Sequence, residues 1–126
     1  MSDLFATTGR AMAAQLVRLN TIASNLANAG AVAGTEAGAY RALKPVFATA
    51  ADGGVDVAAI ARTGSPEKRL DPGHPLADAQ GFIWQAAVDP NQELVEMVET
   101  ARQYANDVEV LTAAKSLALD TLRLGR

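Results

Sequence analysis

Cysteine is absent from the 126-residue chain, and histidine occurs only once. Without cysteine there is no disulfide framework and no thiolate chemistry, and a single histidine excludes a metal site built from several imidazoles. A Ser/His/Asp triad would have to use His74, which stands in the turn sequence Pro72-Gly73-His74-Pro75. A histidine between two prolines is typical of a structural turn, so we expect no enzyme, no metal site and no cofactor.

Long apolar runs and blocks of one charge are also missing. No stretch approaches the roughly 20 apolar residues that span a bilayer, and the N-terminal segment lacks the parts of a secretory signal. The chain has 11 basic and 14 acidic residues, and the basic residues form no cluster of the kind that binds nucleic acid. We therefore expect no membrane insertion, no cleaved signal peptide, no nucleic acid partner and no small-molecule substrate.

Aromatic residues make up only 5% of the chain although 49% of it is hydrophobic, because alanine supplies much of the apolar count. Alanine favours helices and close approach between helices more than it favours a thick core. The composition therefore indicates packed helices around one modest core, in a chain of ordinary single-domain length.

The segment from residue 3 to about residue 28 has the pattern of an amphipathic helix. Its apolar stripe recurs at seven-residue intervals and is widened by two further residues; the stripe comprises Phe5, Met12, Leu16, Leu19, Ile22 and Leu26. No proline interrupts the segment. A seven-residue apolar repeat is typical of helices that pair.

A second helix is predicted from residue 90 to residue 124. Asp89 supplies an N-cap, Pro90 takes the first helical position, and Gly125 follows the last turn. Its pairing face is predicted to comprise Leu94, Met97, Val98, Tyr104, Val108, Leu111 and Leu122. With the N-terminal stripe as partner, the two helices would form an antiparallel or oblique coiled-coil-like pair.

The second helix carries a further apolar stripe on roughly its opposite side: Val110, Leu117 and Leu124. A two-helix hairpin would leave this stripe in water, so it indicates contact with another subunit. The alternative is one broad apolar face that curls over the segment between the helices. Two asparagines late in the first helix, Asn25 and Asn28, indicate either a frayed helix end or further contacts between subunits.

Between the helices, glycine and proline are frequent and short apolar runs replace helical periodicity. Residues 40–48, 55–61 and 82–88 are predicted to be strands, and residues 65–78, with three prolines, a loop or turn. The sequence thus predicts an α+β fold. Residues 1–34 and 89–126 are expected to form a terminal helical assembly domain, and residues 35–88 a small β-rich middle domain.

Several motifs resemble those of flagellar rod and hook proteins. The run Ala23-Ser24-Asn25-Leu26-Ala27-Asn28-Ala29 is similar to the N-terminal motif of this axial superfamily. The chain resembles FlgC-type proximal rod proteins at Tyr40-Arg41, 71–78, Gly81-Phe82-Ile83, 104–111, Lys115-Ser116 and 121–125. One departure is Ala86-Ala87-Val88-Asp89, where such proteins usually have Pro-Asn-Val-Asp.

The resemblance implies a structural subunit of the basal-body rod that polymerises through its terminal helices. These would build the torque-transmitting axle around the export channel and serve motility. Implied partners are copies of the chain, other rod proteins and the flagellar type III export apparatus. The resemblance also implies synthesis in the cytoplasm, export without a cleaved signal peptide and a periplasmic position in the rod. The alternative is a helical adaptor or secretion-apparatus subunit that binds a single partner.

Overall fold

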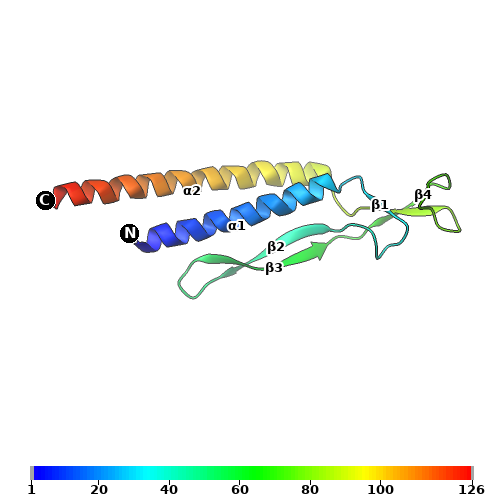
Figure 1. Ribbon diagram of the computed structural model, residues 1–126, viewed down its shortest axis with the longest axis horizontal. Helices are drawn as coiled ribbons and strands as arrows, with labels where there is room; N and C mark the ends of the chain where they lie inside the picture. The colour runs from blue at the N-terminus through cyan, green and yellow to red at the C-terminus, as the bar shows by residue number, and fades with distance from the viewer. Residues whose placement is uncertain (1, 126) are drawn as a thin grey trace.

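Two long helices frame the chain in the computed structural model, which describes residues 2–125. α1 (Ser2–Ala27) and α2 (Pro90–Leu124) lie side by side and run in opposite directions, so the chain starts and ends at the same end of the molecule (Figure 1). α2 has 35 residues and α1 has 26, and the last turns of α2 extend past the start of α1. The predicted antiparallel pair of terminal helices is confirmed.

The start of α2 follows from its capping residues. The carboxylate of Asp89 accepts hydrogen bonds from the backbone N–H groups of Asn91 and Gln92, at 3.1 and 3.4 Å. Pro90 occupies the first turn, where its missing N–H leaves no bond unmade. These local interactions fix the helix start at the residue that the sequence indicates.

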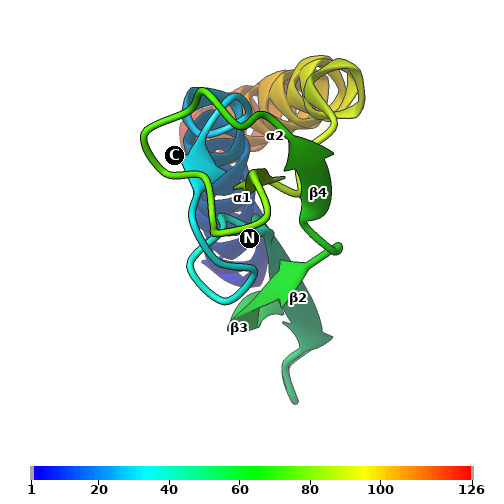
Figure 2. The same cartoon turned by 90° about the vertical axis from the view of Figure 1, so that its right-hand side faces the viewer.

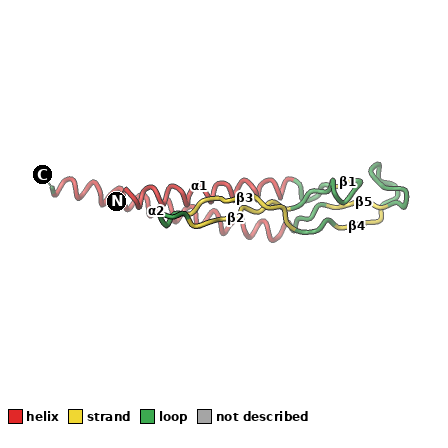
Figure 3. The backbone as a smooth tube through the Cα atoms, turned by 90° about the horizontal axis from the view of Figure 1, so that it is seen from below, coloured by secondary structure: helices red, strands yellow, loops and turns green. Residues whose placement is uncertain are grey.

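Five strands lie between the helices in two small antiparallel sheets. β2 (Ala42–Thr49) and β3 (Val55–Thr63) form a long hairpin. The other sheet has the order β1 (Val32–Ala33), β5 (Phe82–Gln85) and β4 (Glu67–Leu70). The hairpin runs along α1 on the side away from α2, which Figure 2 shows end-on, and the three-stranded sheet lies beyond the helices (Figure 3). The predicted α+β class, with a small β-rich insertion between helices, is confirmed.

The ends of the three predicted strands are shifted by up to three residues, and two further strands were not predicted. β4 falls inside residues 65–78, which were expected to be loop, and the two residues of β1 were not expected to form a strand. All four side chains of β4 are exposed, so this strand shows no alternation of apolar and polar residues. It is held instead by pairing with β5 and by Lys68, whose ammonium lies 4.3 Å from the centroid of the Phe82 ring.

The core is thin and is built largely from small side chains. Its buried apolar residues are Ala14, Ile22, Ala39, Ala42, Ile83, Ala86 and Ala114. Alanine-rich contacts let helices and strands approach closely but bury little area each. Neither described helix is long and apolar enough to cross a bilayer, and residues 2–125 hold no cluster of three or more metal-ligating side chains.

Candidate assembly surfaces

The face of α2 that packs on α1 follows a heptad of its own. Partly or fully buried positions recur at alternating spacings of four and three residues, at Glu93, Met97, Thr100, Tyr104, Asp107, Leu111, Ala114 and Ala118. This is the a/d spacing of a coiled coil, so the coiled-coil-like character of the pair is confirmed. Several of these positions carry polar or small side chains. We refer to this set as the α2 seam.

Thr100 shows how a polar residue fits into the α2 seam. Its side chain is fully buried, and its hydroxyl donates a hydrogen bond to the carbonyl of Glu96, one turn earlier, at 2.7 Å. The hydroxyl therefore needs no partner on α1. Together with Ala114, which is 2% exposed, it permits a close approach of the two helices.

The α2 seam differs from the pairing face that the sequence predicted. Met97, Tyr104 and Leu111 are half-buried in the seam, but Leu94, Val98, Val108 and Leu122 are exposed by 40% to 67%. Leu94, Val98 and Val108 each follow a seam residue by one position, which rotates them about 100° away from it. Small residues occupy the close contact, and the larger aliphatic ones point outward.

The predicted stripe of α1 is divided between two neighbours, because α1 packs on α2 and on the hairpin. Ile22 is 2% exposed, and Phe5, Met12, Leu19 and Leu26 are half-buried. Leu16 is the exception, since 47% of it is exposed. In a single chain it is therefore not part of the pairing core.

The second stripe of α2 is open to solvent. Val110, Leu117 and Leu124 are exposed by 45% to 89%. The hairpin packs on α1 and reaches α2 only through the side chains of Lys44 and Glu96 among the described residues, so the middle segment does not cover the stripe as the broad-face alternative requires. Together with the displaced residues above, they give α2 an outward apolar surface, which comprises Leu94, Val95, Val98, Val108, Val110, Leu117, Leu119, Leu122 and Leu124.

Asn25 lies inside the chain and not on its outer surface. The residue is 1% exposed, its amide nitrogen donates to the carbonyl of Leu43 at 2.9 Å, and its amide oxygen accepts from the Leu43 N–H at 2.8 Å. The same oxygen accepts the Tyr40 hydroxyl at 2.7 Å. Asn25 thus bonds β2 as a neighbouring strand would. All three of these bonds lie within the chain, and its contact with another subunit stays a prediction.

Asn28 follows the last residue of α1 and bonds back to the end of that helix. Its amide nitrogen donates to the carbonyl of Ser24 at 2.8 Å, and its backbone N–H also bonds that carbonyl, at 3.1 Å. The side chain is half-buried. These bonds correspond to the helix-end interpretation of the asparagine cluster.

Arg10 fastens the turn of the hairpin to α1. Its guanidinium donates to both carboxylate oxygens of Asp56, one of them at 3.0 Å, and to Asp52 at 2.5 Å. The hydrogen bonds with Asp56 raise the pKa of Arg10 most strongly. The pKa of Asp52 is lowered, first by the hydrogen bond from the Gly54 N–H and then by the nearby charge of Arg10. A Cβ at Gly54 would lie 2.8 Å from the guanidinium, so glycine makes this approach possible.

Comparison with known proteins places both terminal segments in one group. A family model described as "Flagella basal body rod protein" matches residues 5–34, and one described as "Flagellar basal body rod FlgEFG protein C-terminal" matches residues 79–124. The flagellar basal-body rod protein FlgC of Salmonella typhimurium is 43% identical over 98% of this chain and 97% of its own length. The chain belongs to the FlgC family of flagellar basal-body rod proteins.

Other FlgC proteins also match over more than nine tenths of the chain. FlgC of Yersinia enterocolitica is 43% identical, again over 98% of this chain and 97% of its own. FlgC of Borreliella burgdorferi is 28% identical, over 94% of this chain and 92% of its own. As a FlgC-family protein, the chain is a structural subunit of the basal-body rod, as its motifs implied.

The two matched regions coincide with the helical half of this FlgC-family chain. Residues 5–34 contain nearly all of α1 with Asn25, and residues 79–124 contain β5 and all of α2. The hairpin and β4 lie in the unmatched segment between them. The rod-family features of this chain are thus concentrated in the paired helices and in the residues that join them to the sheets.

Sequence reasoning missed two groups of residues. The polar members of the α2 seam could have been found by extending the four-and-three spacing from Met97, Tyr104 and Leu111, because their positions alone define the heptad. The contacts of Arg10 had no such signal. They join residues 42 and 46 positions apart, and no local pattern specifies such a pair.

Proposed function

We propose that this rod subunit polymerises through the outward apolar surface of α2, while the α2 seam holds its own helix pair together. The exposure of Val110, Leu117 and Leu124 carries the proposal. A helix with apolar residues on both sides is normally buried on both sides, and α1 covers only one. Such an exposed aliphatic surface supports burial by neighbouring subunits, as in head-to-tail helical assemblies.

In this proposal the chain has two parts with different tasks. Residues 1–34 and 89–126 form the assembly domain, and residues 35–88 form the middle domain, which packs on α1 and is tied to it by Asn25 and Arg10. The assembled helices form the torque-transmitting axle around the export channel, with no catalytic role. Copies of the chain and other rod proteins are its neighbours. The subunit reaches its periplasmic position through the flagellar type III apparatus, without a cleaved signal peptide.

Replacement of Leu117 by glutamine tests the assembly surface. Because Leu117 is 60% exposed, the isolated chain should keep its fold, whereas rod assembly should fail. We expect loss of swimming in soft agar and loss of export of the later axial proteins. Leu70→Gln is a matched control, since Leu70 is also 60% exposed but lies on β4, away from the helices. Normal motility of the Leu117 variant would contradict the proposal.

A further inference from the structure

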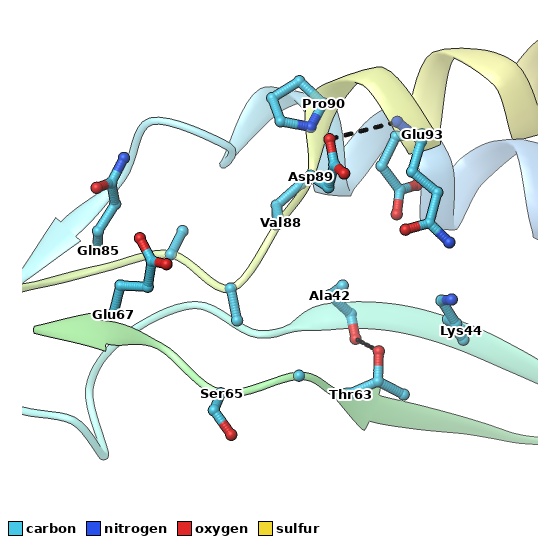
Figure 4. A pocket seen from close by; sticks show the side chains of 14 residues that line it. Ala42, Lys44, Thr63, Ser65, Glu67, Gln85, Val88, Asp89, Pro90 and Glu93 are labelled. Carbon is cyan, nitrogen blue, oxygen red and sulfur yellow. Dashed lines mark hydrogen bonds between the residues drawn. The ribbon is translucent and has the colours of Figure 1, made fainter.

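A polar cavity lies where the helices meet the sheets. It has a volume of about 610 Å³ and opens between the first turn of α2 and the ends of β2, β3 and β5 (Figure 4). Its charged lining consists of the ammonium group of Lys44 and the carboxylates of Glu67, Asp89 and Glu93. Three carboxylates against one ammonium make the cavity acidic. We call it the junction pocket.

Glu93 is the unusual member of this lining. It is 3% exposed, and its Oε2 atom has no hydrogen-bond partner among the described residues. Figure 4 shows its side chain extending from α2 towards the strand that carries Ala42 and Lys44. The positive end of the helix dipole offsets part of the cost of burying this charge, but a buried carboxylate is normally also paired with a cation.

Two other charged groups of the junction pocket, Asp89 and Lys44, have partners of their own. The Asp89 carboxylate caps α2 through the N–H groups of Asn91 and Gln92. The Lys44 ammonium lies 3.9 Å from a carboxylate oxygen of Glu96, one turn further along α2. Glu67 lies on the exposed strand β4, so Glu93 is the buried carboxylate that these pairings leave for an external cation.

We propose that the junction pocket receives the guanidinium or ammonium group of a basic side chain from a neighbouring rod subunit, with Glu93 as its ion-pair partner. Arginine is the best fit, because its planar group can bond two carboxylate oxygens at once.

This inference rests on the proposed assembly, and it is tested in assembled rods of the full chain. A photo-crosslinking amino acid replaces Ser65, an exposed residue of the pocket lining, and the crosslinked peptides are identified by mass spectrometry. We expect a crosslink to a segment containing lysine or arginine, either in a second copy of this chain or in a different rod protein. The peptide sequence distinguishes these two sources.

Two variants show which group binds the cation. In Glu93→Gln the crosslink should fall about tenfold, as for the loss of a pair worth 1.4 kcal/mol. In Lys44→Met it should persist. In the isolated chain, Glu93→Gln should melt at the wild-type temperature or above it, because an unpaired buried charge is removed. Clear destabilisation there, abolished in the Lys44→Met background, would instead make Lys44 the partner and overturn the proposal.

The proposal is also overturned if rods assemble and Ser65 yields no crosslink, yields only crosslinks within its own chain, or reaches segments without a basic residue. A crosslink that is unchanged in the Glu93→Gln variant would also overturn the proposal. These outcomes leave the assembly surface of α2 untouched, because rods are present in each. The assembly proposal is tested separately: it fails if the Leu117→Gln variant still forms normal rods.

Discussion

At the scale of single residues, buried polar groups position the parts of this chain. Asn25 bonds both backbone groups of Leu43 and the hydroxyl of Tyr40, and thereby fixes where β2 lies along α1. Thr100 fills a close contact between the helices and satisfies its own hydroxyl. In a core built mostly from alanine, such directional bonds select one arrangement among several of similar buried area.

Asn25→Ala should therefore destabilise the chain by about 2 kcal/mol, because it leaves partly buried N–H and C=O groups without partners. Urea denaturation of the isolated protein, followed by circular dichroism, measures this change. Asn20→Ala is the matched control: it has the same side chain on the same helix, but Asn20 is exposed. Equal effects of the two substitutions would show that Asn25 contributes only helix propensity.

At the scale of secondary-structure elements, the hairpin is held to α1 by Arg10, Asp52 and Asp56 as well as by apolar contacts. The ion pairs are partly open to water, so each contributes modestly to stability. Their main contribution is to fix the position of the hairpin on α1. They hold the turn of the hairpin beside the first half of α1, while Asn25 holds its other end.

The attachment of the hairpin should weaken in acid. The pKa of Asp52 is lowered in the folded chain, so its contribution is fully present above the ordinary carboxyl value near 4 and is lost as the pH falls through the lower folded-state value. The NMR shift of the Gly54 N–H reports this titration, because that N–H donates to Asp52 at 3.0 Å.

Replacement of Arg10 separates the two causes that lower the pKa of Asp52. In Arg10→Ala the Asp52 midpoint should rise only part of the way to 4, because the hydrogen bond from Gly54, the larger cause, remains. Arg62→Ala changes an exposed arginine on the same hairpin and should leave the midpoint in place. A midpoint unchanged in Arg10→Ala would mean that the ion pair does not form in solution.

The elements were predictable to different degrees. The bounds of α2 follow from local capping chemistry at Asp89 and Pro90, so they could be read from the sequence. The face of α2 that packs on α1 could not be predicted. A hydrophobic pattern favours Leu94 and Val98 over Thr100 at the contact, whereas close packing of the helices favours the smaller Thr100. β4 was missed since its side chains are all exposed and its pairing with β5 is a tertiary interaction.

At the scale of the whole molecule, one chain buries much less apolar surface than its helices offer. The α2 seam is rich in small and polar residues, and the larger aliphatic residues of α2 face outward. Helical stability in proteins comes mainly from packing of the apolar face. Full order of the helices is therefore expected only where neighbours cover the outward surface.

Hydrogen exchange on the isolated chain should show weak protection of residues 3–28 and 90–124, and weakest protection after Ala118, where the α2 seam ends. In assembled rods the same amides should be strongly protected, because packing suppresses local opening. Raising the concentration of the isolated chain should increase protection of α2 first. Strong protection that is independent of concentration would contradict the idea that assembly orders the helices.

The antiparallel course of the helices also has a practical consequence for labelling. Since α1 starts and α2 ends on the same side, reporters near the start of α1 and the end of α2 both mark that end of the molecule (Figure 1). The exposed turn around Gly73 lies at the far end, beyond roughly 50 Å of helix. One dye at each end would give a molecular ruler, and its orientation in a stained rod would show which end faces the cell.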